Sequence, residues 1–282
     1  MKNAPHQPDR IVFWGRSVLQ IGPLNHRVYL MHVHPEDCPQ VVHWAEDRAE
    51  EQNLGKIVAK VPESLAHHFW PRGFGLEARI PGLFHGVEDG LYLSRFIDPT
   101  RGAIADAEQG LDLVRSRQEK RDCQELPKGM RLVSMTKNNA GLMAALYAQI
   151  FRSYPFPLFD PLYIQQIMHS HVRFYGVFQD AHLLALASCE MDVEHAYVEM
   201  TDFATHPQAR NMGLGFHLLC TMQTDMAREG LRTAFTIART AIPGINAVFN
   251  RAGYSWAGTL VNNTHMDGGL ESMHVWWARL EE

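Results

Sequence analysis

Two carboxylates in one short stretch are the residues best suited to chemistry. Glu199 and Asp202 lie in "HAYVEMTDFAT", whose alternation of apolar and polar residues predicts a strand over residues 195–205. A carboxylate at such a position can accept a proton from a substrate, directly or through water. Regular alternation would place Glu199 and Asp202 on opposite faces of the strand. We therefore expect Glu199 to be a general base or a strand-end salt bridge, and Asp202 to cap a turn or recognise substrate.

The residues that follow, "THPQARNMGLGFHLL" (205–219), place a proline, an arginine and two glycines between this strand and a predicted helix. Exposed amides at a helix N-terminus, together with the helix dipole, favour anions. Gly213 and Gly215 have no side chain, so a pyrophosphate could approach the main chain closely. The stretch lacks the Gly-Lys-Ser/Thr of a P-loop and the early G-x-G-x-x-G of a dinucleotide fold. An ordinary turn without a ligand is the alternative.

The order of these features resembles the GNAT acetyltransferase superfamily: R-x-x-G-x-G after a strand and a proline, then a strand, a helix and "GY". In that superfamily the loop holds the pyrophosphate of acetyl-CoA. The resemblance implies acetyl-CoA as the acetyl donor, no metal, and an α/β (α+β) GNAT fold with a mixed, mostly antiparallel central sheet flanked by helices. The residues implied at the phosphates are Arg210, Asn211, Met212, Gly213, Leu214 and Gly215. Asn211 stands where the family usually has glycine, and asparagine tolerates left-handed backbone well.

Longer strings resemble a narrower family, the β-lysine N6-acetyltransferases, over about 56–97 and 130–278. These strings are "KIVAKVPES", "GFGLEARIPGLFHG", "EMTDFATHPQARNMGLG" and "NRAGYSWAGTLVNNTHMDGGLESMHVWW". The resemblance implies acetyl transfer to the side-chain amine of β-lysine, which gives the zwitterionic osmolyte N6-acetyl-β-lysine. Two alternatives stay open: the same chemistry on another amine, such as α-lysine, a polyamine or a protein lysine, and a non-catalytic acyl-CoA-binding module.

The same resemblance implies roles for particular residues. Glu199 precedes Arg210 by the offset at which GNAT histone acetyltransferases place their general base, and a lysine-like ammonium must lose a proton before it attacks. Main-chain amides at the end of the strand would stabilise the oxyanion and pair with the pantetheine arm. Those amides are expected at Phe203, Ala204 and Thr205. GNAT enzymes often carry a tyrosine acid where this chain has Phe249, so a dedicated acid is in doubt, although CoA can leave as a thiolate.

A substrate with two amines and a carboxylate needs acidic and amide partners. The candidates, from their place in the resembling strings, are Glu190, Asp202, Asn262, Asn263 and Glu271. Each is alternatively a hairpin or loop residue without a ligand. "YPFPLF", residues 154–159, is expected to form a wall or lid. Asn246 matches a position that commonly bonds the cofactor, with a helix cap after Pro243 as the alternative.

The cysteines and histidines point to no metal. His32, His34 and Cys38 in "HVHPEDC" are the best ligand set, but no second pair follows at zinc-like spacing. The four cysteines are far apart in the chain and form no CxxC pair, which predicts separate thiols in a reducing compartment. They are Cys38, Cys123, Cys189 and Cys220.

The elements that must position these residues divide into two predicted domains, 1–125 and 126–282, because Pro127 and Gly129 follow a charged amphipathic stretch at 105–121. Strands are predicted at 27–33, 56–61, 131–135, 172–179, 183–191, 195–205 and 233–238, helices at 41–54, 63–70, 140–152, 162–169, 214–228 and 245–252, and hairpins at 73–97 and 253–280. Both hairpins follow a strand, a helix and a glycine-aromatic pair. The N-terminal domain therefore reads as a reduced copy of the C-terminal half of the second domain, although any such series of elements looks similar.

Composition narrows the class of protein. A chain of 282 residues suits two domains, and a net charge of −5 with scattered basic residues argues against nucleic acid. The N-terminus is polar and no apolar run approaches the ~20 residues that span a bilayer, which predicts a cytoplasmic protein without a membrane partner. The first 120 residues could dimerise the protein, cover the substrate pocket or complete the fold.

Overall fold

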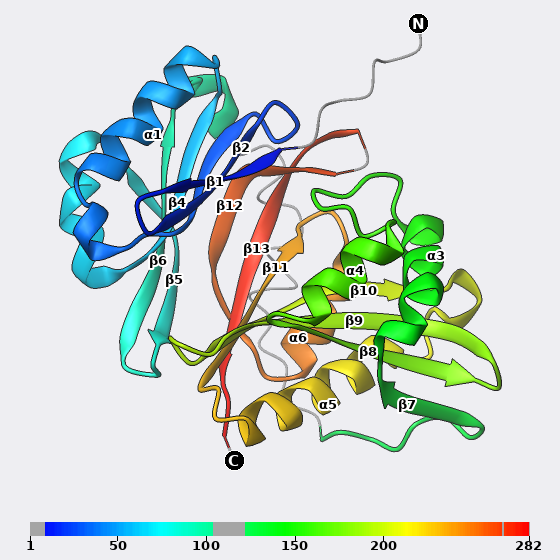
Figure 1. Cartoon of the computed structure of the whole chain (residues 1–282). Coiled ribbons are helices and arrows are strands. Elements are labelled where there is room, and N and C mark those ends of the chain that lie inside the picture. The colour runs from blue at the N-terminus through cyan, green and yellow to red at the C-terminus, as the bar shows by residue number, and fades with distance from the viewer. Residues whose placement is uncertain (1–8, 104–121, 267, 282) are drawn as a thin grey trace, which may run out of the picture.

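Strands from both ends of the chain join in one sheet (Figure 1). The computed structural model describes residues 9–103, 122–266 and 268–281. The thirteen strands of the sheet lie in the order β1-β2-β3-β4-β6-β5-β12-β13-β11-β10-β9-β8-β7. Their bounds are β1 Arg10–Trp14, β2 Ser17–Gly22, β3 Arg27–His32, β4 Lys56–Pro62, β5 Gly75–Phe84, β6 Glu88–Phe96, β7 Met130–Ser134, β8 Val172–Gln179, β9 His182–Asp192, β10 Tyr197–Thr205, β11 Thr233–Arg239, β12 Ser255–Met266 and β13 Gly269–Arg279.

The α-helices of the described residues are α1 Gln40–Glu51, α3 Ala140–Ile150, α4 Pro161–Met168, α5 Leu214–Arg228 and α6 Pro243–Arg251. Every predicted strand, helix and hairpin outside 105–121 is found within a few residues of its expected place, although residues 63–70 form 3-10 turns. The charged stretch 105–121 lies outside the described residues. Strands β1 and β2 were not predicted. None of the described helices is long and apolar enough to cross a membrane.

The two halves of the sheet repeat one topology. In the N-terminal half β3 runs parallel to β4, β4 is antiparallel to β6, and β6 forms a hairpin with β5. In the C-terminal half β10, β11, β13 and β12 have the same relations in the same order. Gly73 and Gly253 both adopt left-handed backbone, and each precedes a buried aromatic residue. The topology agrees with the internal repeat expected from the sequence.

The halves meet where β5 pairs antiparallel with β12, at Ala78 opposite Gly258. The two strands approach so closely that a Cβ on Gly258 would lie 2.1 Å from the carbonyl oxygen of Glu77. Glycine is required there, since its φ of +150° is also rare for other residues. A single core continues across this seam, with Val58, Ile80 and Tyr92 from one half and Phe235 and Leu260 from the other.

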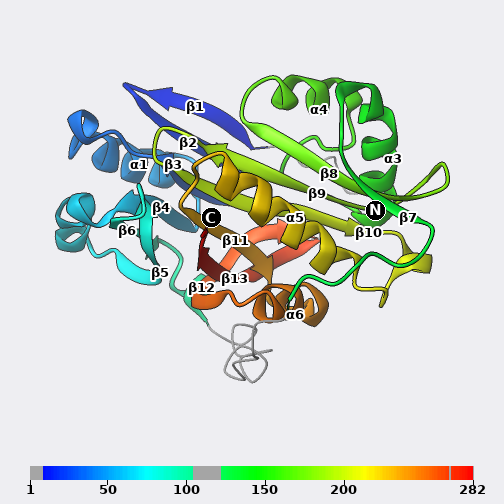
Figure 2. The same ribbon diagram turned by 90° about the horizontal axis from the view of Figure 1, so that it is seen from below.

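Helices cover both faces of the C-terminal half (Figure 2). One face packs against α5 and α6. In α5 the buried apolar side chains recur at helical spacing, as in Leu214, Leu218 and Met222. The other face packs in part against α3 and α4. Beside these helices the same face packs against the N-terminal half. Strands β9 and β10 therefore lie next to α3 and α4 on one side and the N-terminal half on the other.

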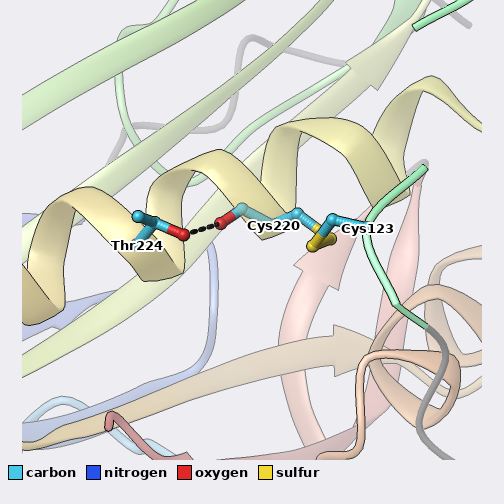
Figure 3. The surroundings of a disulfide bond; sticks show 3 residues. All are labelled: Cys123, Cys220 and Thr224. Carbon is cyan, nitrogen blue, oxygen red and sulfur yellow. Dashed lines mark hydrogen bonds between the residues drawn. A yellow bond between two sulfur atoms is a disulfide. The ribbon is translucent and has the colours of Figure 1, made fainter. Parts of the chain in front are cut away.

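One expectation about cysteines is wrong. Cys123 forms a disulfide with Cys220 on α5, with their Cα atoms 6.0 Å apart (Figure 3). The segment around Cys123 passes alongside the middle of α5. The two cysteines are 97 residues apart in the sequence, so their pairing could not be predicted from spacing. Cys38 and Cys189 are free thiols, as expected.

Candidate active site

Strands β10 and β11 separate at Glu199. Their parallel pairing runs from Tyr197 opposite Thr233 to Glu199 opposite Phe235 and ends there, although β10 continues to Thr205 and β11 to Arg239. Among the residues that the structure describes, the edge of β10 that faces β11 is therefore unpaired over its last residues, among them Phe203, Ala204 and Thr205. The main-chain amides that the resemblance implied at the end of the strand lie along this opening, and extended ligands bind such edges by main-chain hydrogen bonds.

The glycine-containing loop lies at the same end of β10, directly before α5. Residues 210–213 are exposed, and Asn211 and Gly213 both adopt left-handed backbone, with φ of +66° and +73°. Within the part of the chain that the structure describes, no amide from 211 to 215 donates a main-chain hydrogen bond. The loop thus presents free N–H groups at the positive end of a helix, beside the exposed guanidinium of Arg210.

Three carboxylates gather on one face of β9 and β10. Glu190 pairs directly opposite Glu199 across the two antiparallel strands, so their side chains point the same way. Ser188, two residues before Glu190, donates a hydrogen bond of 2.5 Å to Asp202. The three acids therefore share one site next to the strand opening, although the sequence had suggested them separately, Glu199 as a base and Glu190 and Asp202 as substrate partners.

The predicted separation of Glu199 and Asp202 onto opposite faces is wrong. The register with β9 shifts between Thr201 and Ala204, which inserts one extra residue into β10, and Asp202 takes a left-handed φ of +56°. This bulge reverses the alternation that follows it. Phe203 packs on the α5 face against Phe249, with ring centroids 5.4 Å apart, while Asp202 joins Glu199.

Burial makes these carboxylates reluctant to ionise. It is the largest effect on Glu199 and raises its pKa, which Asp202 raises further and the ammonium of Lys60 lowers. The pKa of Glu190 is raised by burial and then by the charges of Glu199 and Asp202. Burial also raises the pKa of Asp202, against the hydrogen bonds from Ser188 and Tyr154. A site with several such groups can hold a base that is effective near neutral pH.

The loop between α3 and α4 closes over the carboxylates. Tyr154 donates a hydrogen bond from its hydroxyl to Asp202, and Leu158 is buried in the core below α3 and α4. This agrees with the wall or lid expected from "YPFPLF". Ser188 was missed, because a serine inside an apolar strand carries no signal of function.

Asn246 and Phe249 are both buried in α6. The Asn246 amide donates to the carbonyls of Arg239 and Ile242, at 2.8 and 2.9 Å, and accepts from Trp276 at 2.9 Å. These contacts hold the turn before α6 from within the helix. The capping alternative is wrong, because Ile242 is the N-cap of α6 and no side chain caps it among the described residues. Phe249 packs against Phe203 and supplies no proton.

The remaining predicted substrate residues lie on β12 and β13, in contact with other partners. Asn262 donates to the carbonyl of Arg101 at 2.8 Å, and the carbonyl of Asn263 accepts from Arg27 at 2.6 Å. Glu271 forms a two-point ion pair with Arg239, at 2.6 and 2.7 Å. Their direct role with substrate stays a prediction, while their contacts join β12 and β13 to neighbouring parts of the fold.

The histidines are arranged differently from the sequence expectation. His34 caps a short turn through its ring nitrogen, away from any group of ligands. Among the described residues, the group of side chains that could hold a metal ion is His32, Asp192 and His195, whose ligand atoms lie within 4.8 Å of one another. Asp192 also holds the ring of His195 through a hydrogen bond of 3.0 Å, which accounts for their proximity without an ion.

Lys60 is a second residue of the site that the sequence did not reveal. It comes from β4 in the N-terminal half, and its ammonium lies 4.8 Å from the ring centre of Tyr197, two residues before Glu199. No sequence pattern connects positions so far apart along the chain. The curvature of the sheet brings them together, and the N-terminal half thereby forms one wall beside the carboxylates.

Comparison with known proteins gives consistent matches. Residues 143–254 match the model of the acetyltransferase (GNAT) family. The chain is 30% identical over 272 residues to the β-lysine N(6)-acetyltransferase of Methanococcus maripaludis, covering 95% of this chain and 98% of that relative. It is 35% identical over 158 residues to the enzyme of the same name from Methanosarcina mazei, covering 56% of this chain and 58% of that relative. Among solved structures, spermidine N-acetyltransferase from Vibrio cholerae aligns with a TM-score of 0.47 and 14% identity, over 55% of this chain and 97% of that chain.

Proposed function

Because the chain belongs to the GNAT family, it is an acetyltransferase that uses acetyl-CoA, and we propose that it acetylates the side-chain amine of β-lysine. The predictions of a GNAT fold and of acetyl-CoA as donor are confirmed by this membership. The substrate proposal is supported by the match to a β-lysine N(6)-acetyltransferase across nearly the whole of both chains. The product is N6-acetyl-β-lysine.

Acetyl-CoA is proposed to lie across the open end of β10. Its diphosphate binds the free amides of residues 211–215 and the guanidinium of Arg210. The pantetheine arm pairs with the unpaired edge at Phe203 to Thr205, so that the acetyl group comes next to Glu199. The main-chain N–H groups at Phe203 to Thr205 also donate hydrogen bonds to the thioester oxygen as negative charge develops on it.

Glu199 is proposed as the general base. It takes a proton from the N6 ammonium of the substrate, and the neutral amine then attacks the thioester carbonyl carbon. The nitrogen of the tetrahedral intermediate loses its extra proton to solvent, and the intermediate expels the CoA thiolate as the carbon–sulfur bond breaks. The thiolate takes a proton from solvent, and Glu199 returns its own proton to solvent. Glu190 and Asp202 form an acidic wall for the ammonium groups of the substrate. The observation that carries this proposal is the cluster of three carboxylates at the strand opening, of which Asp202 is buried and Glu190 and Glu199 are partly buried.

Further features of the chain's biology are proposed from the product and the sequence. N6-acetyl-β-lysine is a zwitterion, which suits a compatible solute made in the cytoplasm. Residues 1–125 and 126–282 are proposed as the two structural units, and a homodimer as the assembly.

The test is a substrate panel. The purified protein receives acetyl-CoA with β-lysine, α-lysine, spermidine or a lysine peptide, and released thiol is measured. We expect β-lysine to give the highest kcat/KM, by at least about tenfold over the others. Preference for the peptide or the polyamine would contradict the assignment. Binding of acetyl-CoA without turnover on any amine would indicate an acyl-CoA-binding module.

A further inference from the structure

A cation from the N-terminal half reaches the carboxylate site. The ammonium of Lys60 lies 4.8 Å from the ring centre of Tyr197 and 5.5 Å from that of Phe235. These two rings belong to β10 and β11, and Phe235 is the residue that pairs with Glu199 where the strands separate. Lys60 therefore lies beside the point at which the acetyl group is proposed to enter.

Lys60 differs from the other cations inside this seam. Lys56 lies four residues earlier on β4. It binds Glu77 at 2.7 Å and the carbonyl of Val261 at 2.9 Å. Arg27 and Arg101 also donate to main-chain carbonyls. The Lys60 nitrogen, by contrast, has no carboxylate oxygen within 4.0 Å, the limit for an ion pair, in the described ranges 9–103, 122–266 and 268–281. The side chain is partly exposed, so a ligand can reach it.

Charges of both signs line the site around Lys60. Glu199, Glu190 and Asp202 lie on β9 and β10 and suit ammonium groups, while Lys60 brings a positive charge from β4 that lowers the pKa of both Glu199 and Glu190. The rings of Tyr197 and Phe235 hold the ammonium in place through cation–π attraction without neutralising its charge. A molecule with an amine at one end and a carboxylate at the other matches charges of both signs at once.

We propose that Lys60 binds the carboxylate of the substrate, so that the N-terminal half completes the active site and selects amino acids over plain polyamines. This rests on the proposed function, because it assigns the carboxylate of the same amine substrate. In β-lysine the carboxylate lies at the opposite end of the chain from the N6 amine, which lets one end face Lys60 while the other faces Glu199. A partly desolvated ion pair of this kind discriminates strongly against a ligand that lacks the charge.

The experiment compares two substrates and three variants. Lys60→Met and the native protein are assayed with β-lysine and with its decarboxylated analogue, a diamine that keeps both amines. We expect Lys60→Met to lower kcat/KM for β-lysine by at least about thirtyfold, and for the diamine by less than about threefold. Lys60→Arg keeps the charge and should retain most of the preference for β-lysine. Lys128→Met, at an exposed position far from the seam, is the matched control and should change neither.

Equal losses on both substrates in Lys60→Met would overturn the proposal and indicate that Lys60 acts on Glu199 instead. The native protein gives a second test that needs no variant: similar kcat/KM values for β-lysine and the diamine would also overturn it. Failure of the native protein to acetylate β-lysine at all is a separate outcome, which removes the proposed function rather than the role of Lys60 alone.

Discussion

Asp202 lies beside Glu199 because β10 contains one residue more than its partner strand allows. The bulge at Thr201 to Ala204 turns the Asp202 carboxylate toward Ser188 and Tyr154, where two hydrogen bonds hold it. A buried carboxylate needs such donors, since an unpaired charge is costly away from water. Asp202 is thus fixed close enough to raise the pKa of Glu199.

Replacement of Glu199 by glutamine should remove the base while keeping the shape of the site. We expect Glu199→Gln to lower kcat by at least about a hundredfold, with little change in the affinity for acetyl-CoA. Released thiol and cofactor binding are measured on the same preparation. Glu194→Gln, in the exposed turn before β10, is the control. Unchanged turnover in Glu199→Gln would remove this residue from the mechanism.

The pH dependence of kcat/KM should reveal the coupling between Asp202 and Glu199. Burial raises the pKa of Glu199, so the base form is lost, and activity falls, at a higher pH than for an ordinary carboxylate. Asp202 raises this pKa further, so Asp202→Asn should lower it and move the acidic limb of the profile to lower pH. The substrate amine titrates identically in both proteins and cancels in the comparison. A limb that stays in place or moves to higher pH would show that the two acids are not coupled as described.

At the scale of residues, the sequence singled out acids that the structure brings together, but it did not predict their orientation. Glu199 and Asp202 were predicted from their position before the loop, since carboxylates in an apolar strand are unusual. Their common face was not predicted, because alternation fails wherever a bulge inserts a residue and no residue type marks this bulge. Lys60 was missed because only tertiary folding brings β4 next to β10.

At the scale of elements, the loop before α5 follows from its own sequence. Gly213 and Asn211 take left-handed backbone, which glycine and asparagine adopt at low cost, and in the described part of the chain no main-chain carbonyl accepts from the amides of 211–215. Most strands and helices were predictable for a similar reason, since their apolar periodicity matches the faces that are buried. Strands β1 and β2 were missed because their residues lie in short runs near a polar terminus.

Substitution in this loop should weaken cofactor binding specifically. Gly213→Val places a branched side chain at φ +73° and disturbs the amides, so we expect the KM for acetyl-CoA to rise by about tenfold or more. Gly129→Val is the matched control, because Gly129 also has a left-handed φ, of +85°, with open space around it, but lies outside the site. Equal effects of the two variants on KM would contradict a phosphate-binding role for the loop.

At the scale of the whole molecule, two related halves share one sheet and one core. The strand order reads the same from β1 inward as from β8 inward, and the halves join at β5 and β12. The sequence indicated this repeat through its two glycine-aromatic pairs, but gave no sign of how the halves would meet. Their contact places Lys60 near β10, so the N-terminal half contributes a side chain beside the candidate active site.

The junction should depend on Gly258. Gly258→Ala sets a methyl group 2.1 Å from the carbonyl of Glu77, so β5 and β12 must move apart. We expect the free energy of unfolding to fall by roughly 3 kcal/mol, measured by denaturant titration. Gly269→Ala, on the neighbouring strand with no atom within 4 Å of the new Cβ, should be nearly neutral. A stable Gly258→Ala variant with native activity would show that the halves do not need this close approach.

The most direct test of the account is a crystal structure with CoA and N6-acetyl-β-lysine bound together. We predict the diphosphate on the amides of residues 211–215, the CoA sulfur in the opening between β10 and β11, and the product amide within reach of Glu199, directly or through one water. Lys60 should contact the product carboxylate. A diphosphate bound elsewhere, or a product amide on the α5 face of β10, would contradict the account.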